Sequence, residues 1–149
     1  MVIFRLGFGL FPIILRPLIK SVTEICVRYA ETDKMSVVYH GNYFSWFEVG
    51  RVGLLNEVGI PYREIEKAGY QLPVLEAHAE FASPAEFDDH LTVETTIPEK
   101  PMARVRLNYA IHRGTTLIAS GYTVHVFINE RGAPVRPPKL FRDHINPCF

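Results

Sequence analysis

Cysteine is scarce in this chain, and charge of one sign is not in excess. The 149 residues include only two cysteines, Cys26 and Cys148, so no C-x-x-C pair and no disulfide framework is present. This cysteine usage is typical of a reducing cytoplasm. The 16 Lys and Arg residues balance 16 Asp and Glu residues. Because a neutral chain has no basic field to hold a phosphate backbone, nucleic acid is not expected as a partner.

Long hydrophobic runs are also missing. The uncharged run from Leu6 to Leu15 is ten residues long, whereas a membrane-spanning helix needs roughly 20. Pro12 and Pro17 interrupt helix formation in this part of the chain, so no transmembrane segment is expected. Residues 1–20 are interpreted as an apolar extension that packs on the domain or on a neighbour. Peripheral membrane contact and a cleaved signal remain open alternatives.

The familiar motifs of several enzyme classes are absent. No G-x-G-x-x-G, P-loop or G-x-S-x-G is found, which argues against nucleotide-fold dehydrogenases, P-loop enzymes and serine hydrolases of the elbow type. The six histidines show neither H-x-H nor H-x-x-x-H spacing, so neither a metal nor a cofactor is predicted. The Asp88-Asp89 pair lies in a predicted turn and is interpreted as a solvated loop.

The length and the 48% hydrophobic content predict one globular domain. An alternation of period two begins at Thr23, where we expect the fold to start. Within residues 24–29, the side chains of Ile25, Val27 and Tyr29 share one face, as a half-buried strand requires.

The period changes at Tyr43. From there to Val58, apolar residues populate nearly every side of a predicted helix, so the helix must be enclosed, and Gly59 is placed to cap its C-terminus. Gly50 and Gly53 lie near one another on this helix, where a missing side chain lets a sheet approach closely.

A short polar helix is predicted over residues 61–68, and Gly69 ends it. Everything after Gly69 is predicted as strand, with alternating segments at 91–97 and 103–111 and a long run at 117–128. The first two segments are expected to pair as a hairpin. We therefore predict an α+β architecture in which one antiparallel sheet wraps a single helix over residues 21–140, followed by a tail at 141–149.

A specific motif runs from the first strand into the long helix. Residues 27–51 match most positions of the loose pattern V-R-Y-x-x-T-D-x-x-G-x-V-Y-H-x-N-Y-x-x-W-x-E-x-x-R. This resembles the 4-hydroxybenzoyl-CoA thioesterase-like family of hotdog-fold acyl-CoA thioesterases. Weaker echoes at Leu72-Pro73-Val74, 84–89 and 132–136 extend the resemblance over about residues 21–140. It implies the hotdog fold and hydrolysis of an acyl-CoA to a free acid and coenzyme A.

The resemblance also implies roles for individual residues. Asp33 matches the carboxylate that acts as nucleophile or general base on the thioester carbonyl, and the backbone N–H of His40 matches the oxyanion donor. The side chain of His40 is a candidate for orienting Asp33 or the attacking water, and Glu48 is a second candidate base. Substrate contacts are expected at the residues around the helix start, namely Tyr39, Gly41, Asn42 and Tyr43.

Some motif residues favour structural roles. Glu48 and Arg51 lie three residues apart on an apolar helix and are expected to neutralise each other. Tyr39 and Trp46 are expected to form core or pocket wall. The family usually has glycine where this chain has Ser36, so a positive φ at that position would carry a modest strain cost.

By resemblance, subunits pair through their sheets, and unpaired sheet edges independently favour association. A homodimer or homotetramer is expected, with an acyl-CoA, or an acyl group on acyl carrier protein, as substrate. A non-catalytic acyl-CoA-binding hotdog protein is the alternative function. A hydratase or dehydratase of the same fold is disfavoured because such enzymes carry D-x-x-x-x-H, whereas six residues separate Asp33 from His40 here.

Overall fold

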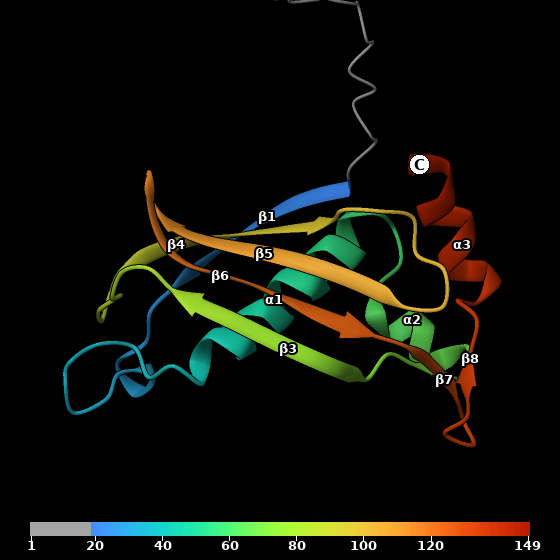
Figure 1. Cartoon of the computed structure of the whole chain (residues 1–149), viewed down its shortest axis with the longest axis horizontal. Coiled ribbons are helices and arrows are strands. Elements are labelled where there is room, and N and C mark those ends of the chain that lie inside the picture. Colours follow the sequence, from blue (N-terminus) through green and yellow to red (C-terminus); the bar gives the residue numbers. More distant parts are fainter. Residues whose placement is uncertain (1–18) are drawn as a thin grey trace, which may run out of the picture.

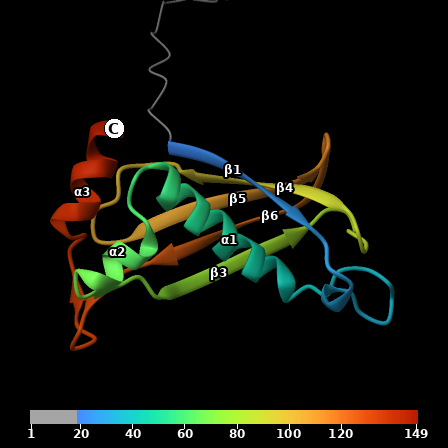
Figure 2. The same cartoon turned by 180° about the vertical axis from the view of Figure 1, so that it is seen from behind.

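The computed structural model describes residues 19–149, in which a curved antiparallel sheet packs against one long helix (Figure 1). The sheet has five strands in the order β1-β4-β5-β6-β3. Helix α1 (Asn42–Glu57) crosses one face of this sheet, as the view from behind shows (Figure 2). The large strands are β1 (Ile19–Cys26), β3 (Val74–Phe81), β4 (His90–Ile97), β5 (Val105–Arg113) and β6 (Thr116–His125). The predicted α+β arrangement is confirmed.

The first strand begins earlier and ends earlier than predicted. Strand β1 starts at Ile19 rather than Thr23, and it pairs along its whole length with β4. The chain then turns into a short 3-10 helix, η1 (Tyr29–Glu31), so that Tyr29 is 77% exposed instead of sharing a buried face with Val27. Because period-two alternation continued past the true strand end, the sequence did not reveal this turn.

Strands β4, β5 and β6 form the predicted antiparallel centre of the sheet. In the β4–β5 pair, Val93 lies opposite Ile111, which confirms the expected hairpin. Alternate residues of β4 and β5 are buried against α1, as a sheet with one covered face requires. Strand β3 is an outer strand that pairs with β6, and nearly all of its residues are exposed.

The close approach of α1 to the sheet depends on two glycines. A Cβ at Gly50 would lie 2.3 Å from Thr95 Oγ1, and a Cβ at Gly53 would lie 2.4 Å from Thr23 Oγ1. Both distances are far below van der Waals contact, so the helix sits where only glycine fits, as predicted. The expected enclosure of α1 is incomplete in the single chain, because the apolar side chains of Phe44 and Val49 are exposed.

The predicted end of α1 is confirmed, since Gly59 has a φ of 86° and follows the last turn. Helix α2 (Tyr62–Lys67) comes next and ends before Gly69, which also has a positive φ. A small sheet then closes this end of the molecule, with its strands in the order β2-β7-β8. The three strands are β2 (Tyr70–Gln71), β7 (Phe127–Asn129) and β8 (Pro134–Val135).

The C-terminal segment is helical rather than strand or tail. Helix α3 (Lys139–Ile145) leads into a short 3-10 helix, η2 (Asn146–Cys148). Phe141 and Ile145 are buried in the core, and Phe141 packs edge-on against Phe127 with ring centroids 4.9 Å apart. Phe141 and Ile145 lie four residues apart and therefore on the same side of α3, but this helix is too short to show a clear period in the sequence.

Among residues 19–149, no helix is both long enough and apolar enough to cross a membrane. The apolar run from Leu6 to Leu15, and with it most of the predicted N-terminal extension, lies outside the described residues. The last two residues of that extension, Ile19 and Lys20, belong to β1.

Candidate active site

The loop between β1 and α1 carries Asp33 at the end of the molecule opposite the small sheet (Figure 1). An isolated β-bridge between Thr32 and Val38 closes the base of a tight turn. Within this turn, the N–H of Asp33 donates to Val37 O at 2.9 Å, and the N–H of Ser36 donates to Asp33 O at 2.9 Å. Asp33 is therefore held in a compact, hydrogen-bonded turn.

Ser36 occupies the turn position where the family usually has glycine, and its φ is 63°. A left-handed conformation is costly for a residue with a Cβ and free of that cost for glycine. The expected strain is thus present, but the turn still closes through the hydrogen bonds of Asp33 and Val37.

The carboxylate of Asp33 is half-buried and only partly engaged. Its Oδ1 accepts a hydrogen bond of 2.7 Å from the backbone N–H of Met35. Its Oδ2 accepts none from the residues that the structure describes. One oxygen thus orients the side chain, as in an Asx turn, and the other is available for chemistry.

The N-terminus of α1 presents backbone N–H groups. Asn42 N–H donates to Tyr39 O and Tyr43 N–H donates to His40 O. In contrast, the N–H groups of His40 and Gly41 donate to no protein acceptor within residues 19–149. Free amides at the positive end of a 16-residue helix are suited to binding negatively charged oxygen.

Glu31 anchors the loop to α1, a role that the sequence did not suggest. Its buried carboxylate accepts hydrogen bonds from the Arg28 backbone at 2.7 Å, the Arg28 guanidinium at 3.0 Å and the Trp46 indole at 3.1 Å. Its backbone oxygen accepts from Tyr39 N–H and from Asn42 Nδ2 at 2.8 Å. Burial by itself raises the pKa of Glu31, but these donors outweigh it and hold that pKa below its usual value.

The aromatic side chains that follow the loop line a shallow pocket of about 260 Å³ between the helix start and the end of β3. His40 and Tyr43 contribute to its wall together with Phe81. Tyr43 is buried, whereas Tyr39 is half-exposed and packs against the His40 ring with centroids 4.3 Å apart. Tyr39 is therefore not a core residue, while Trp46 is buried in the core. No hydrogen bond joins the His40 and Asp33 side chains in the described part of the chain.

A second pocket of about 330 Å³ runs along α1 towards β3. It begins at Phe44 and Ser45 in the first turns of the helix, and its lining includes Glu48. Three of its polar residues are buried in the sheet and helix, namely Arg51, Thr123 and His125.

The buried histidine in this pocket is held neutral. His125 Nε2 lies 2.7 Å from Thr123 Oγ1, and Nδ1 lies 3.2 Å from Leu72 O. Burial, followed by the charge of Arg51, lowers the pKa of His125 to about 4. The sequence around His125 matched no motif, so no local signal marked this residue as part of a pocket.

The predicted Glu48–Arg51 ion pair is wrong. Arg51 is 8% exposed, donates to Leu72 O at 3.2 Å and lies over the Tyr62 ring at 5.1 Å. Glu48 is exposed, and no ion pair joins it to Arg51 among residues 19–149. The arginine is satisfied instead by a backbone carbonyl and an aromatic face that the fold brings beside it.

The family model described as the thioesterase-like superfamily matches residues 27–145, which include the loop, α1 and every strand of the large sheet except β1. The chain belongs to this superfamily. The sheet wrapped around α1 is accordingly the hotdog fold, as the motif predicted.

Relatives of this thioesterase-like chain agree with that assignment. A Bacillus subtilis protein named "Putative acyl-CoA thioesterase YneP" is 33% identical over 83% of this chain and 91% of its own length. The crystal structure of hypothetical protein TT1821 from Thermus thermophilus has a TM-score of 0.83 and 34% identity, covering 87% of this chain and 99% of that one. The DHNA-CoA thioesterase from Staphylococcus aureus has a TM-score of 0.79 and 35% identity, with coverages of 83% and 85%.

Within this thioesterase-like fold, the predicted site residues form two groups. The turn of Asp33 and the amides of His40 and Gly41 lie in one continuous loop before α1, and Asn42 fixes that loop through Glu31. Glu48 lies further along α1 and lines the larger pocket.

Proposed function

We propose that this protein hydrolyses acyl-CoA thioesters, with Asp33 as the nucleophile or general base. The observation that carries the proposal is the half-buried carboxylate of Asp33, held by Met35 N–H through one oxygen and free at the other, in the loop that leads to the unpaired amides of His40 and Gly41. Such an arrangement combines an activated oxygen with donors for an oxyanion, which are the two requirements of acyl transfer.

In this mechanism, the thioester carbonyl accepts hydrogen bonds from the His40 and Gly41 amides, and the dipole of α1 favours the charge that develops on its oxygen. Asp33 either attacks the carbonyl carbon, forming a mixed anhydride that water then cleaves, or removes a proton from the attacking water. In both routes the C–S bond breaks, coenzyme A leaves as the thiol, and the acyl group leaves as the carboxylic acid.

Thiol release tests the proposal directly. Wild-type protein is expected to release free thiol from members of a panel of short, long and aromatic acyl-CoAs, with acyl groups on acyl carrier protein included. Asp33→Asn, which keeps the side-chain shape and removes the charge, is expected to lose orders of magnitude in kcat. Normal folding of the variant is checked by its circular dichroism.

Glu48→Gln serves as the matched comparison because Glu48 is the other candidate base. Full activity of Asp33→Asn with inactive Glu48→Gln would transfer the catalytic role to Glu48. A folded wild-type protein that binds acyl-CoA and releases no thiol would replace hydrolysis by the non-catalytic binding function.

The acyl group is proposed to enter the 330 Å³ pocket beside α1. This pocket starts at Phe44, one turn beyond the free amides, and contains the buried polar groups of Arg51, Thr123 and His125. Polar groups at the inner end of a pocket favour an acyl group that itself carries hydrogen-bonding atoms over a plain alkyl chain. A higher kcat/KM for hydroxylated aromatic acyl-CoAs than for alkyl acyl-CoAs is expected, and the reverse order would contradict this part of the proposal.

We also propose a homo-oligomer built through β3. The outer edge of this strand pairs with no other strand among residues 19–149, and Val74, Leu75 and Phe81 are each about half exposed. The exposed apolar residues of α1, Phe44 and Val49, add to the surface available for a second copy. Pairing of two β3 edges would protect both edges and extend the sheets into one.

Light scattering coupled to size exclusion tests this association. The wild-type protein is expected to elute as a dimer or tetramer, and Leu75→Asp is expected to shift it towards monomer. Leu117→Asp is the matched control, because Leu117 is also exposed but lies at the β5–β6 turn. Equal masses for all three proteins at monomer size would rule out the association.

A cytoplasmic location is part of the proposal. It rests on the two cysteines, Cys26 and Cys148, which are both exposed free thiols. Fractionation of cells that express the protein is expected to recover it with cytoplasmic markers, and recovery with membranes would favour peripheral contact through residues 1–20.

A further inference from the structure

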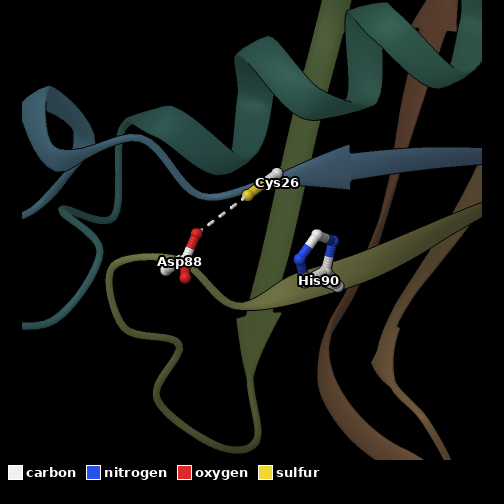
Figure 3. Close-up of side chains that lie close together, drawn as sticks. All are labelled: Cys26, Asp88 and His90. Carbon is white, nitrogen blue, oxygen red and sulfur yellow. Dashed lines mark hydrogen bonds between the residues drawn. The ribbon is translucent and has the colours of Figure 1, made fainter.

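A cluster of three metal-ligating side chains lies at one corner of the large sheet, outside the candidate active site. Cys26 ends β1, His90 begins β4, and Asp88 lies in the loop just before β4 (Figure 3). One ligand atom from each residue, the thiol sulfur, a carboxylate oxygen and a ring nitrogen, lies within 4.8 Å of the others. All three residues are exposed, so the cluster is open to solvent ions.

The register of the sheet brings two of these residues together. Cys26 lies directly opposite His90 in the antiparallel β1–β4 pair, whereas the preceding pair, Ile25 and Leu91, points to the core side. Directly opposed residues project from the same face of a sheet with Cβ atoms about 5 Å apart. Cys26 and His90 therefore share the outer face.

The third ligand is placed by a special backbone conformation. Asp88 has a φ of 67°, and hydrogen bonds from Asp88 N–H to Val27 O and from Val27 N–H to Asp89 O hold the loop against the end of β1. In this conformation the Asp88 carboxylate accepts a hydrogen bond of 3.7 Å from the Cys26 thiol. One carboxylate oxygen of Asp88 thus faces the sulfur.

The electrostatics of the corner favour a cation. The negative charges that act on the Cys26 thiol are the carboxylates of Asp88, Glu31 and Asp89. Asp89 is neutralised by Arg113 at 2.5 Å and Glu31 by Arg28. Neither Asp88 nor His90 forms an ion pair with any of the residues 19–149.

We propose that Cys26, Asp88 and His90 form a binding site for a divalent transition-metal ion, with Zn²⁺ as the preferred ion. Thiolate, imidazole and carboxylate are the three zinc ligand types in proteins, at about 2.0–2.3 Å from the metal. Small side-chain rotations bring the three ligand atoms onto such a sphere, and the fourth position stays open to water. Binding replaces the thiol proton: the Zn–S bond forms, and the proton is released to solvent.

The sequence predicted no metal site because metal-binding motifs are recognised from histidines and cysteines that lie a few residues apart in the chain. Cys26 and Asp88 are 62 residues apart and meet only through the β1–β4 pairing. A bound ion would cross-link the end of β1 to the start of β4 at the base of the loop that carries Asp33. It would therefore stabilise the folded state without entering the proposed reaction.

Cobalt titration of the reduced, tag-free full chain tests the site, because Co²⁺ coordinated by a thiolate gives an intense near-ultraviolet charge-transfer absorption. The wild-type protein is expected to develop this absorption up to one Co²⁺ per chain and to lose it when Zn²⁺ is added. Cys148→Ser is the matched control, since it removes the other exposed thiol, and it is expected to behave as wild type.

Variants of the ligands separate the site from adventitious binding. Cys26→Ser is expected to abolish the charge-transfer absorption. His90→Gln and Asp88→Asn are each expected to weaken Co²⁺ binding by more than about tenfold. Loss of a residue that only hydrogen-bonds to a metal ligand already lowers metal affinity by about tenfold or more, and here a ligand itself is lost. Asn tolerates a positive φ, so Asp88→Asn tests the charge rather than the fold. Unchanged thermal melting without metal verifies the fold of each variant.

Three results would overturn the proposal: no charge-transfer absorption in the wild-type protein, its loss in Cys148→Ser, or its persistence in Cys26→Ser. Asp33→Asn is expected to bind Co²⁺ as the wild type does, so the metal site stands or falls independently of thioester hydrolysis.

Discussion

The indole nitrogen of Trp46 donates a 3.1 Å hydrogen bond to the buried carboxylate of Glu31, and this bond ties α1 to the loop that carries Asp33. The same carboxylate accepts hydrogen bonds from both the backbone N–H and the guanidinium of Arg28. A single buried charge thus joins the end of β1, the loop and the second turn of α1. Thioester hydrolysis needs the loop and the helix amides in a fixed relation, so Glu31 is a positioning residue in the proposed mechanism.

Replacing Glu31 by Gln is expected to lower the free energy of unfolding by about 1.5–3 kcal/mol, the range for hydrogen bonds to a charged group. Urea unfolding at neutral pH measures this change. Glu24→Gln is the control, because Glu24 is exposed on β1. The pKa of Glu31 is lower in the folded state than in the unfolded chain. The stabilisation by its carboxylate is therefore fully present at a pH above the ordinary pKa of glutamate, and it is lost as the pH falls through the folded-state pKa. Equal effects of the two substitutions would contradict the anchoring role.

Replacing Ser36 by Gly is expected to stabilise the protein. Relief of the left-handed strain gives about 1–2 kcal/mol, and the greater freedom of glycine in the unfolded chain takes back about 0.4–1 kcal/mol. Ser36→Val is expected to destabilise, because a β-branched residue tolerates a φ of 63° poorly. Thermal melting of the three proteins gives the order Gly, Ser, Val from most to least stable. Any order with Val above Ser would argue against the strain.

Thr95 is fully buried, and its hydroxyl has no hydrogen-bond partner among residues 19–149. Thr95→Val keeps the shape and removes this unsatisfied group, so we expect the free energy of unfolding to rise by about 1 kcal/mol. Thr123→Val is the matched opposite case, because the Thr123 hydroxyl lies 2.8 Å from Tyr109 Oη and 2.7 Å from His125 Nε2. That substitution is expected to cost about 1–3 kcal/mol. Two changes of the same sign in denaturant unfolding would contradict the pair of assignments.

His125 is expected to make the protein less stable in mild acid. Its pKa is about 4 in the folded state, against 6.5 normally, because burial and then Arg51 disfavour the charged form. The unfolded chain binds more protons between these two values, so stability falls as pH decreases from about 6.5 to about 4, by roughly 3 kcal/mol at most. His125→Gln is expected to flatten this part of the stability–pH profile. An unchanged slope in the variant would show that other groups cause it.

His40→Ala is expected to retain most of the thioesterase activity. The proposed donor to the oxyanion is the backbone N–H of His40, which the substitution preserves. The His40 side chain packs on Tyr39 and has no hydrogen bond to Asp33. Measured kcat within about tenfold of wild type fits the backbone role. A loss of 10²-fold or more, with the bell-shaped pH profile altered, would instead assign general acid–base chemistry to the imidazole.

Much of the architecture follows from local patterns. The sequence predicted the apolar helix with glycines at 50 and 53, the hairpin of β4 and β5, and the turn glycines at 59 and 69. Each of these features depends on residues that are close together in the chain. The positive φ at Ser36 was likewise predictable, since the family glycine marks a position that needs it.

Other features depended on contacts between distant segments. The buried Arg51 finds Leu72 O and the Tyr62 ring instead of Glu48, which only the packing of α2 and the following strand determines. The helix at the C-terminus forms because Phe141 and Ile145 meet a core that the rest of the chain has already built. Local propensity in seven residues is too weak to predict this.

The sequence by itself determined the α+β architecture and the loop that carries Asp33, because alternation, helix period and motif spacing are all encoded by near neighbours. The resemblance of its motif implied the family and the hotdog fold. Only the tertiary structure decided that Glu31 meets Trp46 and that Cys26, Asp88 and His90 meet at one corner of the sheet. Glu31 meets Trp46 because the loop after β1 packs against α1, whereas Cys26 meets His90 through strand register. Period-two alternation specifies which face a residue occupies but leaves open which residue of another strand lies opposite it.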